Sequence, residues 1–401
     1  MTVKQIYELM NTVTGEVLGK TDLVAEDLSN VVDVGTEVFN ATAVDNYVKT
    51  LVNHIGKVIF VNRPYSGKIP SVLMDSWEFG SVLEKISCDT PAAEENESWD
   101  LVDGQEYKQD IFYKPTVSAK FFNSKVTFEV PMSFTEKQVK ESFSNAAQLN
   151  GFISMIYNAV DRSMTIKIDG LVMRTINSMI AQTLNADKTA FAGGYGTAST
   201  ARCVNLLKLY NDKFFPATGS TANPDALTAA KAIYDPDFIR FASYTMGVYV
   251  DRLASISTLF NVGGKDRFTD ANNLHVIMLS DFAKGADVYL QSDVRHNEMT
   301  RLPNYETIPY WQGSGQNYEF DSTSAINVKI DASTTVEIDG IVGVMFDRDA
   351  LGVSNLDRRV TTAYNAKAEF FNNYYKFDAG YFNDTNENFV VFFVSDAKTG
   401  S

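Results

Sequence analysis

The strongest constraint on the fold is a helical pattern of apolar residues in the second quarter of the chain. Every fourth residue from 152 to 184 is apolar: Phe152, Ile156, Val160, Met164, Ile168, Val172, Ile176, Ile180 and Leu184. At 3.6 residues per turn this row advances about 40° around the helix axis at each step. We therefore predict a long helix, Thr135–Leu184. Because its apolar row winds around the axis, different packing partners should cover it at different points along its length. Thr135 is the predicted N-cap, and Gly151 and Gly170 are predicted points of bending.

Size and charge limit the class of protein. A length of 401 residues favours two or three domains. The formal net charge is -15 and no block of Lys and Arg occurs, which argues against a sequence-specific nucleic-acid binder. Two cysteines are too few for a secreted disulfide scaffold, so we expect reduced thiols and folding in a cytoplasm. No apolar run approaches the ~20 residues that span a bilayer, and no membrane partner is expected.

An acidic stretch separates two predicted strands, 79–87 and 111–130. It contains eight acids against the single Lys108: Asp89, Glu94, Glu95, Glu97, Asp100, Asp103, Glu106 and Asp110. One interpretation is a solvated loop. The other is an exposed hairpin tip that meets a basic partner surface, with Trp99 as its apolar anchor. A third possibility for Trp99 alone is packing within its own hairpin.

The remaining patterns predict a mixed helix and sheet protein. Residues 1–56 carry short amphipathic helices, which are too short to be stable without docking. Strands are predicted at 274–279, 326–330, 335–338 and 341–346, with a helix after Ser280-Asp281. The tail from Arg358 to Val394 is rich in aromatic residues. The Asn383–Asn388 segment predicts a turn within this tail, which favours a terminal β-hairpin or a strand pair.

Catalytic signatures are missing from the sequence. It has no Walker loop, no dinucleotide-binding glycine motif, no nucleophile elbow and no metal-ligand pair of the kind found in zinc enzymes. His275 lies inside an apolar strand, and we predict a core histidine with satisfied hydrogen bonds. Asp384 and Glu387 miss the spacing of an EF-hand, so we interpret them as turn residues rather than calcium ligands. We expect no catalytic residue, no metal and no cofactor.

The order of elements resembles a known fold. A helical N-terminal arm, an acidic hairpin, a long helix, a mixed α/β region and an aromatic strand pair follow one another. Three C-terminal runs are the most similar: IVGVMFDRDAL (341–351), AEFFNNYYKFDAG (368–380) and NFVVFFV (388–394). The chain resembles the major capsid proteins of tailed double-stranded-DNA bacteriophages, whose fold is shared with the encapsulins.

The resemblance implies an α+β fold with four parts. Residues 1–56 would form the N-terminal arm and 76–130 the extended loop, a long β-hairpin called the E-loop. Residues 57–75, 131–190 and 357–401 would form the peripheral domain, which contains the long spine helix. Residues 191–356 would form the axial domain.

The resemblance also implies a function. The chain would self-assemble into hexamers and pentamers of an icosahedral head that encloses the genome, without enzymatic activity. It would be a virion protein, assembled in the host cytoplasm, with a separate scaffolding protein and a portal as partners. Packaged DNA would be contacted non-specifically, through inner-face basic residues such as Arg162, Lys167 and Arg174. The predicted intersubunit contact at the hairpin tip comprises Glu94, Glu95, Glu97, Trp99, Asp100 and Asp103.

Three other functions remain open from the sequence. An encapsulin-like compartment would use the same fold. A tail or baseplate protein would form rings or tubes instead of closed shells. A hydrolase with an acidic pair would place two carboxylates in a concave site, where their pKa values would be shifted.

Overall fold

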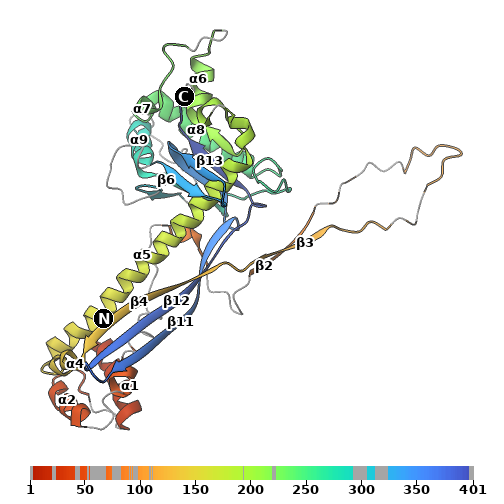
Figure 1. The fold of residues 1–401 in the computed structure, drawn as a ribbon. Coiled ribbons are helices and arrows are strands. Elements are labelled where there is room, and N and C mark those ends of the chain that lie inside the picture. Colours follow the sequence, from red (N-terminus) through yellow and green to blue (C-terminus); the bar gives the residue numbers. More distant parts are fainter. Residues whose placement is uncertain are drawn as a thin grey trace. The chain divides into compact units, whose positions relative to one another are not determined.

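The chain divides into two compact units in a computed structural model. The model describes residues 3–19, 24–40, 46–51, 54, 69–74, 83–89, 91, 93, 98–107, 110, 112–192, 194–218, 223–291, 305–311 and 324–396. Unit 1 comprises residues 1–81, 125–172 and 353–380, and unit 2 comprises residues 82–124, 173–352 and 381–401. The predicted mixed architecture of helices and strands is confirmed, and Figure 1 shows the elements along the chain.

The predicted long helix exists as two helices with a short break. Thr135 is the N-cap of α4 (Glu136–Ser142) and forms a capping box with Gln138. Three residues later α5 begins and runs through Ala146–Ala186. Gly151 and Gly170 both lie inside α5, and neither of them interrupts it. The first part of α5, to Val172, belongs to unit 1 and the rest to unit 2.

Unit 1 contains a four-stranded sheet with the order β1-β11-β12-β4. Its strands are β1 (Leu73–Met74), β4 (Lys125–Thr135), β11 (Leu351–Asn365) and β12 (Phe370–Asn383). β12 pairs antiparallel with β4 along eleven residues, from Phe370 opposite Thr135 to Gly380 opposite Lys125. A short 3-10 helix, Pro70–Val72, precedes β1.

The N-terminal helices form a small core of their own in unit 1. Helices α1 (Val3–Leu18) and α2 (Val31–Asn40) and the helical residues 46–51 bury apolar side chains that include Ile6, Met10 and Val48. Tyr47 lies beside Phe143, with ring centroids 6.3 Å apart. Most of the described apolar side chains of the predicted N-terminal arm are therefore buried within the chain. The docking expected from their short length is confirmed.

Close packing of α2 depends on Gly35. A Cβ atom at this position would lie 2.6 Å from Cβ of the buried Phe143. We expect Gly35→Ala to lower the free energy of unfolding by about 1–3 kcal/mol, because the helix must shift to make room. The matched control is Gly151→Ala in α5, where nothing lies within 4 Å. Alanine is the better helix former, so the control should be neutral or more stable by up to ~1 kcal/mol. Urea denaturation measures the free energy of unfolding of both variants. A loss of stability of the same size in both would contradict the steric explanation.

Unit 2 is built on a five-stranded mixed sheet with the order β5-β13-β10-β6-β7. The strands are β5 (Cys203–Asn205), β6 (Leu274–Leu279), β7 (Tyr305–Ile308), β10 (Ile341–Asp347) and β13 (Phe389–Phe393). Every residue of β13 is buried, so both faces of this strand are covered. One face belongs to a core that includes side chains of three helices, α6 (Leu206–Phe214), α8 (Pro236–Leu253) and α9 (Ser280–Gln291).

Short-range sequence features explain several turns and helix ends in unit 2. Asp235 caps α8 and Pro236 occupies its first turn. Two short strands, β8 (Ile326–Lys329) and β9 (Thr335–Ile338), form a hairpin, and Gly340 follows with a left-handed φ of 74°. A fourth helix, α7, is short (Ala229–Ala232).

The predicted terminal hairpin is wrong. The Asn383–Asn388 turn exists, but the two strands that it joins belong to different sheets. β12 pairs with β4 on one sheet, whereas β13 pairs antiparallel with β10 and parallel with β5 on the other. Alternating aromatic residues predict strands correctly, yet they do not specify which partner each strand takes.

Candidate functional site: an anchored hairpin

The most distinctive polar cluster of unit 2 lies at the base of a hairpin. β2 (Leu83–Cys88) and β3 (Val117–Phe122) pair antiparallel and continue into a long projection (Figure 1). The register places Lys85 directly opposite Lys120. Two like charges opposite each other destabilise a strand pair unless an anion neutralises them.

Asp384 supplies that anion. Its Oδ2 lies 2.9 Å from Nζ of Lys85 and its Oδ1 lies 2.9 Å from Nζ of Lys120. The carboxylate is almost fully buried, whereas the two lysines are partly exposed. One carboxylate therefore binds both strands of the hairpin at the same level.

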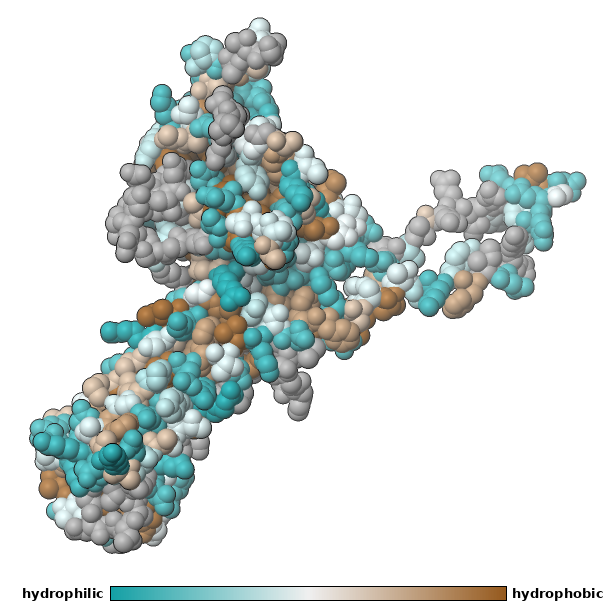
Figure 2. Space-filling model, in the orientation of Figure 1, coloured by the Kyte–Doolittle hydropathy of each residue, from teal (hydrophilic) through white to brown (hydrophobic). Residues whose placement is uncertain are grey.

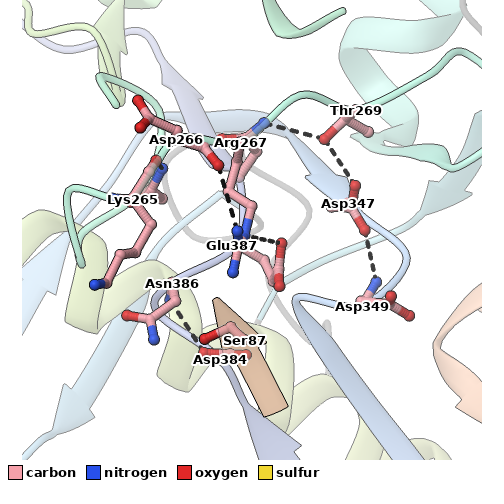
Figure 3. Close-up of polar contacts among 12 residues, drawn as sticks. Ser87, Lys265, Asp266, Arg267, Thr269, Asp347, Asp349, Asp384, Asn386 and Glu387 are labelled. Atoms are coloured by element: carbon pink, nitrogen blue, oxygen red, sulfur yellow. Dashed lines mark hydrogen bonds and ion pairs between the residues drawn. The ribbon is translucent and has the colours of Figure 1, made fainter. Parts of the chain in front are cut away.

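Glu387 adds a second layer to this cluster. It binds Lys85 through Oε1 at 3.1 Å and Nε of Arg267 through Oε2 at 3.1 Å. We name the five residues Lys85, Lys120, Arg267, Asp384 and Glu387 the hairpin anchor. Figure 3 shows Arg267 beside Glu387, with Asp384 and Asn386 of the same turn close by. The interpretation of Asp384 and Glu387 as turn residues is confirmed. Their carboxylate oxygens bind the Lys and Arg side chains of the anchor.

Backbone contacts fix the position of the turn that carries the two acids. The amide of Asp384 donates to the carbonyl of Ala350 at 2.7 Å, and the amide of Gly263 donates to the carbonyl of Thr385 at 2.9 Å. The two segments approach closely, because a Cβ at Gly263 would lie 2.0 Å from Oδ1 and 3.3 Å from Cα of Asn386. The turn is therefore a rigid support against which the hairpin is held.

The electrostatics of the anchor follow from burial and pairing. Burial alone would raise the pKa of Asp384, but hydrogen bonds from Lys120 and Lys85 outweigh it and hold this pKa below its usual value. Burial raises the pKa of Glu387, which Lys85 and Arg267 offset only in part. Burial opposes the charge of Lys85, yet Asp384 and Glu387 raise its pKa. The anchor is thus held together by charge and is weakened when its acids are protonated.

Apolar packing and a second ion pair extend the anchor. Phe122 of β3 packs on the buried Phe382, with ring centroids 5.1 Å apart. Beyond the strands, Lys265 binds Asp89 at 2.6 Å. The inner face of β2 and β3 is consequently held by the rest of unit 2.

The outer face and the far end of the hairpin are exposed and partly apolar. On the outer face Ile86, Val117 and Phe121 are each more than half exposed. Trp99 is 95% exposed and Phe112 is 87% exposed. Figure 2 shows apolar side chains among the hydrophilic ones at the end of the projection. Exposed apolar side chains that gather in one region are typical of a surface that meets a partner.

The predicted hairpin-tip residues divide into two groups. Trp99, Asp100 and Asp103 lie close together in sequence and are all exposed, so packing of Trp99 within its own hairpin is wrong. Glu94, Glu95 and Glu97 lie outside the described residues.

The predicted basic residues on α5 do not form a single cluster. Arg162, Lys167 and Arg174 are all exposed. Arg162 and Lys167 are five residues apart, which separates them by about 140° around the helix. Arg174 lies over the ring of Tyr381, at 5.5 Å from its centroid.

The lysines and the arginine of the anchor were not anticipated. A sequence signal for them exists only in part, since Lys85 and Lys120 occur in two strands that were predicted to flank the acidic stretch. Their direct opposition depends on the register, which the sequence does not fix.

His275 differs from its predicted environment. Both ring nitrogens lack a hydrogen-bond partner among the described residues, and the ring lies 5.9 Å from that of Phe346. Burial lowers the pKa of His275, and the nearby Arg348 lowers it further. β6 brings the ring against an aromatic neighbour instead of a polar one.

Neither a metal site nor a membrane span is found in the described part of the chain. No group of three or more His, Cys, Asp or Glu side chains there could hold a metal ion. Likewise, none of the described helices combines the length and the apolar character needed to cross a bilayer.

Comparison with protein families identifies the chain. The model of the Phi29-like phage major capsid proteins matches residues 10–393. The chain belongs to this family. It is therefore a structural subunit of a bacteriophage capsid and a component of the virion, and the resemblance predicted from the sequence is confirmed. The encapsulin-like alternative is not favoured, because the matching family is a phage capsid family.

Solved structures and curated proteins give further comparisons for this capsid protein. It is similar to a chain in the capsid structure of Staphylococcus phage Andhra, with 8% identity, a TM-score of 0.48, and coverage of 83% of this chain and 86% of that one. A chain in a structure of the head fiber and inner core protein of native bacteriophage P68 gives 8% identity, a TM-score of 0.49 and the same coverage. The capsid of Cyanophage P-SCSP1u gives 9% identity, a TM-score of 0.43, and coverage of 84% and 92%. A search of the curated proteins gave no match.

Proposed function

We propose that the anchored hairpin is the element through which this capsid subunit holds its neighbours in hexamers and pentamers. The observation that carries the proposal is the combination of a fixed base and an exposed apolar tip. Asp384 binds both strands at the base, while Trp99, Phe112 and Tyr113 at the far end are each at least three-quarters exposed. A rigid base reduces the entropy that the tip loses when it docks.

The acidic residues of the tip set the electrostatic character of the contact. Asp100, Asp103, Glu106 and Asp110 are exposed, and no ion pair to a Lys or Arg is found for them within the described residues. The neighbouring surface should therefore present basic side chains. Exposed pairs contribute only ~0–1 kcal/mol each, but a closed shell repeats the contact in every copy.

Charge reversal at the tip tests this proposal. We expect Asp100→Lys combined with Asp103→Lys to leave the subunit folded and to raise the protein concentration required for assembly about 30-fold, from ~2 kcal/mol of lost attraction. Sedimentation of shells against salt is the measurement, and the defect should shrink above ~0.15 M salt as charges are screened.

A control with the same change of net charge is available on unit 2. Asp225 and Asp270 are exposed acids outside the hairpin, and Asp225→Lys with Asp270→Lys alters the net charge equally. Assembly of the tip variant at the level of this control would show that the acids only solvate a loop. The proposal extends to Glu94, Glu95 and Glu97, whose replacement by Lys should act in the same direction.

The remaining features of the proposed function concern chemistry, DNA and assembly partners. We infer no turnover chemistry, because the neighbouring acids Asp384 and Glu387 are bound by Lys and Arg side chains and serve the hairpin. Arg162, Lys167 and Arg174 would contact packaged DNA without reading its sequence, which suits a chain of net charge -15. A separate scaffolding protein and a portal would complete the assembly in the host cytoplasm. The division into N-terminal arm, extended loop, peripheral domain and axial domain also remains a proposal.

A further inference from the structure

Unit 2 carries an aromatic groove on the exposed sides of α6 and α8. Two adjoining hollows of about 530 and 610 Å³ share Phe241 and Tyr244 in their walls. Phe214, Tyr249 and Leu259 line other parts of them. We name this surface the α6–α8 groove. Its volume is sufficient for one large aromatic side chain with its neighbours.

Several large apolar side chains that line the groove are exposed to solvent. Tyr244 is 67% exposed, Leu259 is 61% exposed and Phe214 is 52% exposed. Contiguous exposed aromatic residues with polar groups around them are typical of protein–protein contacts. Because this chain builds a shell, the first candidate for the partner is another copy of the same chain.

Two cations at the groove have no acidic partner of their own. Nζ of Lys213 lies 5.4 Å from the ring centroid of Phe214 and 5.6 Å from that of Phe241. Arg252 lies 5.1 Å from the ring centroid of Tyr249. Neither cation is bound to a carboxylate within the part of the chain that the structure describes. The lining also contains Asp237 and Arg240, which pair with each other at 3.1 Å. With this pair balanced, Lys213 and Arg252 give the aromatic surface an excess of positive charge.

The hairpin tip has the complementary character. Trp99 is almost fully exposed and is followed by Asp100, and Asp103 lies in the next turn. The tip is locally ordered, because the amide of Val102 donates to the hydroxyl of Tyr107 at 2.9 Å. A protruding indole beside carboxylates is complementary in chemistry to a hollow lined by rings and cations.

We propose that Trp99 of one copy enters the α6–α8 groove of a neighbouring copy, where Lys213 and Arg252 face Asp100 and Asp103. The inference rests on the proposed function of the hairpin tip and specifies the surface that receives it. The contact is heterologous, since the tip of each subunit occupies the groove of the next. Such contacts close into rings when the rotation between subunits permits.

Cysteine cross-linking in assembled shells tests the pairing directly. The native Cys88 is exposed and would interfere, so all variants carry Cys88→Ser, whereas the buried Cys203 remains. Shells are assembled from a mixture of Ser98→Cys chains, which keep Trp99, and affinity-tagged Tyr244→Cys chains, and they are treated with a short bismaleimide. We expect cross-linked dimers that contain one chain of each kind, identified by the tag and by the linked peptides. The matched control replaces Tyr244→Cys by Val288→Cys, an equally exposed position on α9.

Two outcomes overturn the pairing. Cross-links of equal yield at positions 244 and 288 would show that proximity is unspecific. Dimers in shells made only from Tyr244→Cys chains, together with no links to position 98 in mixed shells, would show that the groove receives the groove of another copy.

A separate readout distinguishes this inference from the proposed function on which it rests. The fluorescence of Trp99, isolated by comparison with Trp99→Phe, reports whether the tip is buried in the shell. We expect strong protection from acrylamide after assembly and little before it. Protection without a link to Tyr244 would overturn the groove as receptor and leave the tip contact standing. Absence of protection would overturn both.

Discussion

Replacing Asp384 by alanine should release the hairpin and prevent assembly. The substitution leaves Lys85 and Lys120 directly opposite each other with no shared anion. It also removes an acceptor that orders the turn, since the amide of Asn386 donates to Oδ1 of Asp384 at 3.1 Å. Breaking a buried ion pair typically costs 3–5 kcal/mol, and partial exposure of the lysines reduces this to about 2 kcal/mol. Hydrogen exchange of the amides in β2 and β3 is the measurement, and protection there should fall by an order of magnitude or more.

The control for Asp384→Ala is Asp349→Ala in the neighbouring loop. Asp349 is exposed, and Lys85 contacts only its backbone carbonyl, at 3.0 Å, so this variant removes a nearby charge and leaves the anchor intact. Shell formation and hydrogen exchange should remain at the parental level in the control. Parental protection of β2 and β3 in Asp384→Ala would contradict the role of the anchor.

Gly340→Ala should be the most destabilising single-methyl change in unit 2. A Cβ at this position would lie 1.9 Å from the carbonyl oxygen of Val394, which is buried. The residue also has a left-handed φ of 74°, and the amide of Val394 donates to its carbonyl at 2.7 Å. Backbone strain and overpacking add to about 3–5 kcal/mol, which is a large share of the stability of an ordinary domain.

Gly264→Ala separates the two contributions. Gly264 has a similar φ of 62°, but nothing lies within 4 Å of a Cβ built there. We expect this control to lose only about 1–2 kcal/mol, from the backbone conformation alone. Thermal unfolding and the yield of folded protein distinguish the two variants. Equal losses of stability in the two variants would show that the steric clash with Val394 does not contribute.

Local rules of the sequence were sufficient for much of the fold. The apolar row of α5, the capping box at Thr135 and the Asp235-Pro236 start of α8 depend on neighbours in the sequence, and they were predictable. The placement of β12 and β13 in different sheets was not predictable, because the residue pattern of a strand does not specify which strand it pairs with.

The site was less predictable for the same reason. The acidic, Trp-containing tip was apparent in the composition of one stretch. The anchor joins Lys120 to Asp384 across 264 residues and Lys85 to Glu387 across 302 residues. Such a contact depends on the register of β2 with β3 and on the path of the turn at 384–387, neither of which leaves a local signal.

This long separation has a consequence for biosynthesis. A bacterial ribosome adds about 5–20 residues per second, and domains fold as their sequences emerge. Asp384 lies 264 residues after Lys120, so the anion is made roughly 13–50 s after the second strand of the hairpin. A nascent subunit therefore carries Lys85 and Lys120 without Asp384, and its hairpin lacks the support that fixes it. Anchoring of the hairpin therefore has to wait for that interval, during which its two strands lack a fixed base.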